Sequence, residues 1–385
     1  MHISELDYDL PPALIAQSPA EPRDSSRLLV CDRRTQQHQH RHFRDLPAYL
    51  EPNDVLIAND TSVLSARLHG VKPTGGKVEV LLLRKLDDLS WQALVGGRNV
   101  KHLEFHGPSL QNRIVADVTG NANANKHDAT FTVRFSEPIE PHLATLGETP
   151  LPPYIHARVA DPGRYQTVYA RVAGSAAAPT AGLHFTPRLL DEIREKGVQI
   201  AFVTLHVGLD TFKPIDEAVV ESHTIHTEWC ELPQVTADTI NDCRARGGRV
   251  IAVGTTSARV LESGGAHRLA VLTPHLTPRG NETSDMTPDN QGEVPNAMPV
   301  RAARAKGLHP MQPVQALSGF TQLYITPGYH WRVVDGLITN FHLPRSTLLA
   351  MIGSFMGMDF LRQTYALAIK ERYRFFSFGD AMLIV

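Results

Sequence analysis

The chain has 385 residues, 42% of them apolar and 20% charged, an ordinary composition for a globular protein of two or three domains. Its formal net charge of −2 gives no global basic field, so any contact with nucleic acid must use local patches. The three cysteines include no CxxC pair, which argues against a zinc site. We find no signal-peptide pattern and no apolar run of roughly 18 residues, which argues against secretion and a membrane helix and favours the cytoplasm.

The first 65 residues predict part of an α/β unit. Short apolar runs at 28–31 and 54–58 are typical of strands, and the polar quartet NDTS follows the second at 59–62. Polar side chains at the carboxyl end of a buried strand can bind a ligand or cap a loop. Three alternating histidines share one face of an extended segment: His38, His40 and His42. They are either metal ligands or, more commonly for such a pattern, solvated side chains.

Between residues 66 and 149 the pattern changes to short β-prone runs separated by turn clusters. The runs lie at 78–84, 91–95, 115–119 and 130–135. Several short strands at this spacing suggest a small barrel or sandwich. Because α/β segments precede and follow it, we expect 66–149 to be a domain inserted into an α/β domain made of 1–65 and 150–385.

A dense stretch at 179–215 predicts a loop, a helix and a strand in succession. Thr186 fits a helix N-cap, Pro187 a first helical residue and Gly197 a helix stop. The run 198–207 is nearly continuous in apolar residues, as expected for a strand buried on both faces. Three residues flank these elements as site candidates: His184, Phe185 and His206.

Two further segments carry polar groups that could act in chemistry. His226 and Glu228 alternate, so they could transfer a proton or could form a polar pair across two strands. Residues 249–263 read as a strand, the turn GTTS at 254–257 and a helix, and such a turn can hold a phosphate, a carboxylate or a ribose. Residues 264–316 contain seven prolines and no aromatic residue, so we expect a mobile surface excursion.

The stretch 321–358 combines several signals. Residues 322–326 alternate as a strand does, and 331–337 predict a second strand. The polar segment TNFHLPRST at 339–347 precedes an apolar run at 348–356, which predicts a helix capped by the Ser or Thr before it. This arrangement is a common ligand-binding position in α/β sheets, although a capped helix entering a core gives the same pattern. The aromatic segment 373–385 is expected to dock as a strand.

Six long motifs occur in order along the chain: PTAGLHFT at 179–186, LHVGLDTFKPI at 205–215, ESHTIHTE at 221–228, VGTTSARVLES at 253–263, ITPGYHWRVVDGLITNFHLPRSTLL at 325–349 and YRFFSFGDAMLI at 373–384. Together with the opening DYDLPPALIAQSPAEPRDSSRLLV, they resemble the queuosine-biosynthesis family of S-adenosylmethionine:tRNA ribosyltransferase-isomerases. No GxGxxG after a strand, Walker A, HExxH or GxSxG motif competes with this resemblance.

The resemblance implies an enzyme that transfers and isomerises the ribosyl moiety of S-adenosylmethionine onto 7-aminomethyl-7-deazaguanine at the wobble position of tRNAs with a GUN anticodon. The products would be epoxyqueuosine-tRNA, adenine and methionine. A base would remove a proton next to the sulfonium, adenine would leave, and the aminomethyl nitrogen would attack the sugar, without a metal. The family fold, an α/β domain interrupted by a six-stranded β-barrel, agrees with the insert at 66–149. We expect a cytoplasmic monomer with this tRNA and S-adenosylmethionine as partners.

The chain departs from the family pattern at two places. Asp210 stands where the family usually has glycine, and the excursion at 264–316 is longer than the family would suggest.

Two other functions use the same features: a methyltransferase with S-adenosylmethionine as methyl donor, and a non-catalytic tRNA-binding module. Release of S-adenosylhomocysteine would favour the methyltransferase, and tight tRNA binding without a nucleoside change would favour the module.

We predict that three segments far apart in sequence, 254–257, 339–342 and 180–185, converge on one cleft facing the inserted domain. The expected base is His342 or His184, because a nearby helix N-terminus keeps a histidine neutral, unless these histidines only orient loops. The candidate catalytic residues are His184, His342, His226 and Glu228. The candidate substrate-binding residues are Thr180, Phe185, His206, Gly254, Thr255, Thr256, Arg259, Asn340, Ser346, Thr347 and Asp380. No metal ligand is predicted.

Basic residues crowd both ends of the chain: Arg23, Arg27, Arg33, Arg34, Arg41 and Arg44 near the N-terminus, and Lys370, Arg372 and Arg374 near the C-terminus. On one face they would form a track for the anticodon arm; otherwise they are scattered, solvated charges.

Overall fold

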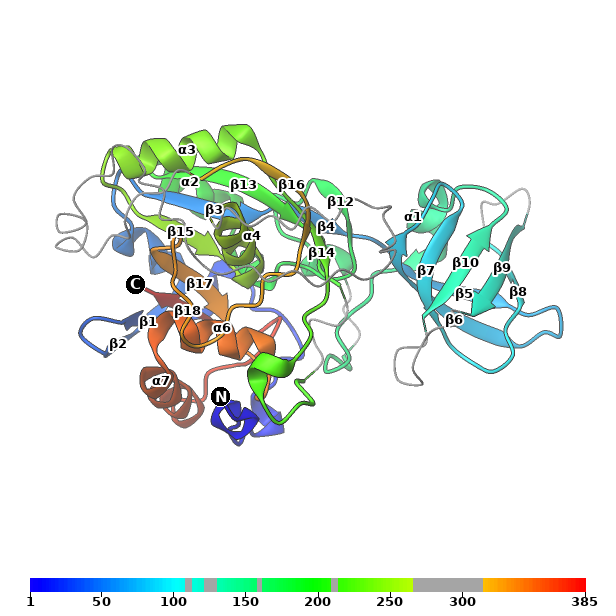
Figure 1. Cartoon of the computed structure of the whole chain (residues 1–385), viewed down its shortest axis with the longest axis horizontal. Coiled ribbons are helices and arrows are strands. Elements are labelled where there is room, and N and C mark those ends of the chain that lie inside the picture. The colour runs from blue at the N-terminus through cyan, green and yellow to red at the C-terminus, as the bar shows by residue number, and fades with distance from the viewer. Residues whose placement is uncertain (108–112, 121–129, 158–160, 209–213, 266–313) are drawn as a thin grey trace, which may run out of the picture.

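The computed structural model describes residues 1–107, 113–120, 130–157, 161–208, 214–265 and 314–385. Asp210 and residues 266–313 lie outside the described residues, so the expectations for that aspartate and for the excursion remain predictions. Figure 1 shows an α/β body from which a separate β-barrel projects, joined to it by extended connections. This is the α/β fold with an inserted small antiparallel barrel that the sequence predicts.

A nine-stranded mixed sheet forms the centre of the α/β body, in the order β16-β14-β13-β3-β15-β17-β18-β1-β2. The four central strands β13, β3, β15 and β17 run parallel to one another. The C-terminal strand β18 lies between β17 and β1, so both ends of the chain complete the sheet. The strands are β1 (Arg27–Asp32), β2 (Gln37–His42), β3 (Val55–Asn59), β13 (Gln199–Leu205), β14 (Glu228–Leu232), β15 (Val250–Val253), β16 (Leu317–Thr321), β17 (Gly336–Asn340) and β18 (Ala381–Ile384).

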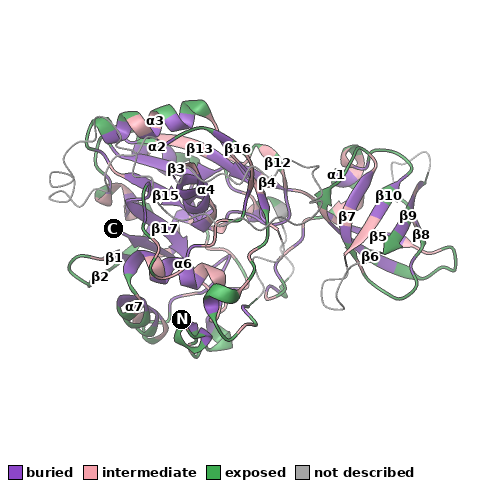
Figure 2. Ribbon diagram, viewed as in Figure 1, coloured by how far each residue is buried: buried purple, intermediate pink, exposed green. Residues whose placement is uncertain are grey.

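Helices cover both faces of this sheet because the strands are apolar on both sides. In β3, Val55 and Ile57 belong to one core cluster, whereas Leu56 and Ala58 belong to the other. Buried side chains of α3 (Gln234–Ala245), α4 (Thr255–Gly265), α6 (Thr347–Met356) and α7 (Met358–Lys370) pack into the first cluster. Those of α2 (Pro187–Glu195) and the short 3-10 helix at Phe43–Tyr49 pack into the second. Figure 2 shows the central strands as buried and the outer side of α3 as exposed.

Helix starts and stops follow the predicted residues. Thr186 caps α2 by accepting a hydrogen bond from the Leu189 N–H, Pro187 is the first helical residue, and Gly197 has a φ of +87° just after the helix. Ser346 caps α6 in the same way, accepting from the Leu349 N–H.

Six antiparallel strands close the barrel in the order β5-β6-β7-β10-β9-β8, with β8 pairing back to β5. The barrel elements are β5 (Arg67–Val71), β6 (Lys77–Lys85), β7 (Ser90–Val95), β8 (His102–Phe105), β9 (Ile114–Gly120), β10 (Phe131–Phe135), α1 (Leu143–Leu146) and β11 (Gly147–Glu148). Two short strands, β4 (Thr61–Val63) and β12 (Val172–Ser175), pair beside the connection to the barrel. The runs predicted at 78–84, 91–95, 115–119 and 130–135 correspond to β6, β7, β9 and β10.

Two strand predictions near the C-terminus are wrong. Residues 322–326 are not a strand, because β16 ends at Thr321, opposite the first residue of β14, and the Leu323 carbonyl accepts instead from the Arg259 guanidinium. The strand predicted at 331–337 begins only at Gly336. The N–H groups of Arg332, Val333 and Val334 donate to the Glu262 carboxylate instead of a neighbouring strand. Gly264 and Gly265, assigned to the excursion, belong to α4.

Candidate active site

Two adjoining clefts open where α4 and α6 begin. Cleft A spans about 660 Å³ of empty space, open solvent included, and is lined by Tyr154, Ala178, Pro179, Thr180, Ala181, Val207, Gly254, Thr255, Thr256, Thr339, Asn340, His342, Leu343, Ser346, Leu348, Phe376 and Ser377. Cleft B spans about 610 Å³ on the same measure and is lined by Gly208, His223, Ile225, His226, Glu228, Thr255, Thr256, Arg259, Tyr324, Ile325, Thr347, Leu348 and Met351. The shared wall consists of Thr255, Thr256 and Leu348. The three segments predicted to converge therefore line one cleft, although no residue of the barrel strands lines it.

The start of α4 is held in place by its neighbours. Gly254 has a φ of +90°, and its N–H donates to the Ile338 carbonyl on β17 at 2.8 Å. The Asn59 amide at the end of β3 donates to Thr256 Oγ1 at 3.2 Å and to the Leu205 carbonyl of β13 at 3.0 Å. Residues of β3 and β17, the strands on either side of β15, thus fix the turn. Thr255 and Thr256, whose N–H groups have no partner within the helix, lie in the shared wall.

Asn340, the last residue of β17, connects cleft A to a buried histidine. Its side-chain oxygen accepts from the Thr180 hydroxyl at 2.9 Å, and its amide nitrogen donates to His184 Nε2 at 3.1 Å. His184 Nδ1 pairs with the Ser26 hydroxyl at 2.7 Å. Because an amide NH2 only donates, Nε2 must accept and the His184 proton sits on Nδ1.

His184 is 5% exposed, stacks on Phe43 at 4.9 Å between ring centroids and does not line cleft A. Burial, with smaller contributions from the charges of Arg374 and Arg23, lowers its pKa to about 3, so the ring is neutral. Both ring nitrogens have partners inside the protein, which is the arrangement of a histidine that orients other groups.

His342 is placed differently. It lines cleft A, its Nε2 lies 2.7 Å from the Thr339 hydroxyl, and its backbone N–H donates to the Tyr365 hydroxyl at 3.0 Å. Burial lowers the pKa of His342 to about 3, so this ring is also neutral at physiological pH. A neutral imidazole beside a cleft can accept a proton.

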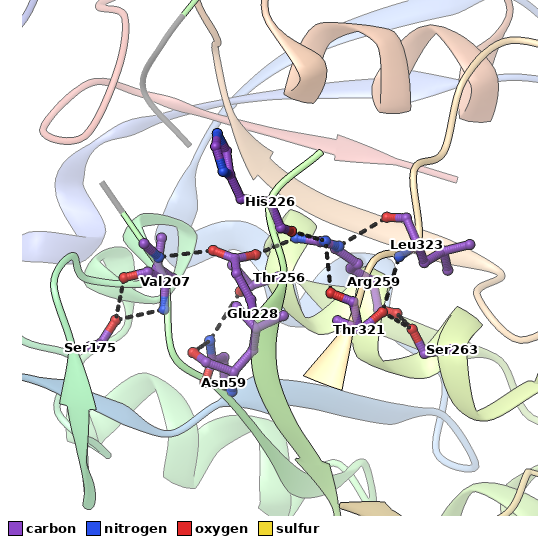
Figure 3. A network of polar contacts seen from close by, with 12 residues as sticks. Asn59, Ser175, Val207, His226, Glu228, Thr256, Arg259, Ser263, Thr321 and Leu323 are labelled. Carbon is purple, nitrogen blue, oxygen red and sulfur yellow. Dashed lines mark hydrogen bonds and ion pairs between the residues drawn. The ribbon is translucent and has the colours of Figure 1, made fainter. Parts of the chain in front are cut away.

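Glu228 and Arg259 form a buried ion pair in the wall of cleft B, shown in Figure 3. Each side chain is 8% exposed. The Glu228 carboxylate also accepts from the Gly208 N–H at 2.9 Å, and the Arg259 guanidinium donates to the carbonyls of His226 and Leu323. The His226 carbonyl takes part in this network, and its ring points away from the other residues drawn (Figure 3).

Three predicted substrate-binding residues do not line either cleft. Phe185 is 1% exposed and packs on Phe43 and Tyr169. Asp380 is 2% exposed, and its carboxylate accepts from the backbone N–H groups of Arg27 and Arg374. His206 pairs through Nδ1 with the Thr61 hydroxyl at 2.9 Å and stacks on Trp229. Their positions indicate support of the surrounding loops.

Sequence reasoning missed several residues that line the clefts. Tyr154, Phe376 and Ser377 line cleft A, and Tyr324 lines cleft B. The aromatic content of 373–378 was the available signal, and it was interpreted only as the docking of a terminal strand. Tyr154 lies in the segment that returns from the barrel, where periodicity carries no information about the cleft.

The two basic ends of the chain do lie next to each other. The Arg27 guanidinium stacks on the Tyr373 ring at 3.6 Å and donates to the Glu371 carbonyl at 2.8 Å. Two arginines are only partly exposed, however, and bind within the protein: Arg23 donates to the Gln166 and Gly163 carbonyls, and Arg33 donates to the Asp335 carbonyl. Arg34, Arg41, Arg44, Lys370 and Arg372 remain exposed.

Within the described ranges, no group of three His, Cys, Asp or Glu side chains could hold a metal ion. His38 and His40 pair instead with the Thr364 and Tyr373 hydroxyls, each at 2.8 Å. A search of the described helices finds none that is long and apolar enough to cross a membrane.

Comparison with known proteins gives one consistent result. The family model described as "Queuosine biosynthesis protein" matches residues 3–384. S-adenosylmethionine:tRNA ribosyltransferase-isomerases from Moorella thermoacetica and Staphylococcus haemolyticus are 47% and 42% identical, and each alignment covers all of both chains. The crystal structure of an S-adenosylmethionine tRNA ribosyltransferase from Thermotoga maritima is 33% identical, with a TM-score of 0.50, covering 99% of this chain and all of that one.

Proposed function

Because this chain belongs to the queuosine-biosynthesis family of S-adenosylmethionine:tRNA ribosyltransferase-isomerases, we propose that clefts A and B hold the reacting groups. The enzyme transfers and isomerises the ribosyl moiety of S-adenosylmethionine onto 7-aminomethyl-7-deazaguanine at the tRNA wobble position, with release of adenine and methionine. The observation that carries the proposal is the opening of two helix N-termini, those of α4 and α6, onto the wall that both clefts share.

The α4 and α6 N-termini suit the carboxylate of the methionine moiety. Free N–H groups and the positive end of a helix dipole stabilise an anion, and here two such ends meet. Thr255 begins α4 and Thr347 begins α6, so each also offers a hydroxyl. The hydroxyl of Thr180, which lines cleft A and is held by Asn340, suits a ribose hydroxyl. A sulfonium between these sites makes the neighbouring C–H acidic.

His342 is our choice for the base that removes this proton. It is the histidine of the predicted pair that lines cleft A, and its imidazole is uncharged. The Thr339 hydroxyl pairs with Nε2 and so fixes the ring, and Nδ1 is then the ring nitrogen left to take up the proton. We assign to His184 and Asn340 the role of holding Thr180 and β17 in register, and to Glu228 and Arg259 that of shaping cleft B.

We propose further that 1–65 and 150–385 form the catalytic domain and 66–149 a separate inserted domain. The tRNA would carry a GUN anticodon, and the protein would act as a cytoplasmic monomer. That the substrate is a tRNA supports the cytoplasmic assignment. The sheet of the barrel closes on itself, which supports the proposal that 66–149 is a separate domain.

Replacing His342 by Ala tests the assignment of the base. We expect turnover to fall about 10²–10⁴-fold, the usual contribution of a general base, while S-adenosylmethionine binding measured by calorimetry is retained. His38→Ala is a matched control, because it also removes a histidine paired with a threonine hydroxyl, and His38 lines neither cleft. Near-normal turnover of a folded His342→Ala enzyme would remove this histidine from the chemistry.

A further inference from the structure

Part of the lining of cleft A is aromatic and comes from two segments far apart in the chain. Tyr154 follows the barrel, and Phe376 lies in the C-terminal loop; both line the cleft. Their ring centroids are 4.7 Å apart with an interplanar angle of 49°. Among the residues that the structure describes, no other Phe, Tyr or Trp ring lines cleft A.

The backbone of Phe376 is held in an unusual conformation. Its φ is +72°, in the left-handed region that bulky side chains rarely adopt. Three hydrogen bonds hold the residue there: its N–H donates to the Phe341 carbonyl at 3.0 Å, and its carbonyl accepts from the Gly379 N–H at 2.9 Å and from the Asn340 amide at 3.2 Å. Such conformations persist only where the surroundings over-determine them, and they concentrate at ligand sites.

Tyr154 is fixed from two sides. Its hydroxyl lies 2.7 Å from the Ser377 hydroxyl, and its carbonyl accepts from the Gln17 amide at 2.9 Å. Burial raises the pKa of the Tyr154 phenol, so the hydroxyl stays protonated and able to donate. The wall therefore combines an aromatic surface with two hydroxyl groups beside it.

On the basis of the function proposed above, we propose that Tyr154 and Phe376 bind the adenine of S-adenosylmethionine, with the Tyr154 and Ser377 hydroxyls beside the base. Cleft A is also lined by the hydroxyls of Thr180 and Thr255 and by the N-terminus of α4, which suit the ribose and the carboxylate. Adenine is the flat, aromatic part of the cosubstrate, and bases stack on aromatic side chains. The wall would orient adenine before its bond to the sugar breaks and hold it as a leaving group.

The two released products allow a sharp test, because only one of them carries the base. Equilibrium dialysis with labelled adenine and, separately, labelled methionine is compared for the wild type and for Tyr154→Leu. We expect adenine binding to weaken about tenfold, as the loss of one stacking partner predicts, and methionine binding to change less than about twofold. Tyr154→Phe keeps the ring and should bind adenine nearly as the wild type does. Tyr324→Leu, an aromatic deletion in cleft B, should leave adenine binding unchanged.

Phe376→Leu is the second variant, and circular dichroism checks its fold because the residue is buried. Equal weakening of adenine and methionine binding by folded Tyr154→Leu, or no change in either, would overturn the proposal. Weaker binding of S-adenosylmethionine with unchanged adenine binding would overturn it as well, since it would show that the rings attract the sulfonium instead. These assays need no turnover, so a failure of the proposed reaction would be seen separately.

Discussion

Asn340 and His184 show how much of this site depends on single side chains that support others. Asn340 reaches from the end of β17 to Thr180 on one side and to His184 on the other. His184 in turn is anchored to Ser26, which directly precedes β1. The Asn340 amide and the His184 imidazole therefore connect three segments that lie more than 150 residues apart in the sequence. The imidazole must be neutral to accept a hydrogen bond from the amide.

This neutrality predicts a pH-dependent stability. The pKa of His184 is lowered to about 3 in the folded protein, compared with about 6.5 in an unfolded chain. Between these values only the unfolded chain takes up the proton, so stability is lost as pH falls below about 6.5, by about 1.4 kcal/mol per pH unit. Urea unfolding should give a free energy about 1.4 kcal/mol lower at pH 5.5 than at pH 7.5 from this residue alone.

The controls for this prediction are two further variants. His184→Gln should lose that part of the pH dependence, whereas His156→Gln, at an exposed position, should keep the wild-type dependence. Equal pH dependence in His184→Gln and the wild type would contradict a neutral, buried His184.

At the level of elements, α4 organises the site through both of its ends. Thr255 and Thr256 at its start form the shared wall, Arg259 one turn later holds the β14 and β16 segments, and Glu262 holds the segment before β17. Glu262 is fully buried and accepts from three consecutive backbone N–H groups, at 332–334, and from the Tyr329 hydroxyl. One helix thereby sets the positions of strands on both sides of the cleft.

Glu262→Gln should lower the free energy of unfolding of the α/β domain by about 3 kcal/mol. The glutamine side chain accepts fewer hydrogen bonds than the carboxylate, and its NH2 group would face backbone N–H groups, which are donors too. Chemical unfolding measures this loss. Glu192→Gln, which removes an exposed carboxylate paired with Arg188 on α2, is the control and should change stability by less than about 0.5 kcal/mol. A Glu262→Gln protein as stable as the control would show that the carboxylate is not what holds the segment.

The elements that sequence could predict are those defined by local signals. The cap Thr186, a Ser or Thr cap before the helix at 348–356, and the β-prone runs of β6 and β10 are predicted correctly, because each depends on neighbours within a few residues. The prediction of a strand at 331–337 is wrong because the N–H groups at its start donate to Glu262, about 70 residues earlier in the chain. Likewise, Tyr154 and Phe376 come from distant parts of the chain, so no local pattern reveals that their rings meet at the cleft.

At the scale of the whole molecule, the barrel could be predicted as an inserted all-β unit, but two of its six closing strands were not found. β5 and β8, RLHGV and HLEF, are short and interrupted by Gly, His or Glu, so their β signal is weak. The motifs placed the cleft at the carboxyl edge of the sheet, whereas the roles of His184, Asp380 and Phe185 depended on burial, which sequence does not give.

The exposed basic residues beside β2 and α7 predict salt-dependent tRNA binding. Each phosphate contact that is lost should reduce the slope of log affinity against log salt by about one unit. The double variant Arg41→Ala/Arg372→Ala should therefore bind with a shallower slope than the wild type. Arg246→Ala, an exposed arginine after α3, should keep the wild-type slope. The same slope in all three proteins would place the tRNA elsewhere.

The most direct test of the central claim is to identify the products. The full-length protein is incubated with S-adenosylmethionine and tRNA carrying 7-aminomethyl-7-deazaguanine, and small molecules and digested nucleosides are quantified by mass spectrometry. We predict equal amounts of adenine, methionine and epoxyqueuosine from the wild type, and about 10²–10⁴-fold slower formation of all three by His342→Ala. Formation of S-adenosylhomocysteine with a methylated nucleoside, and no adenine, would contradict ribosyl transfer in clefts A and B.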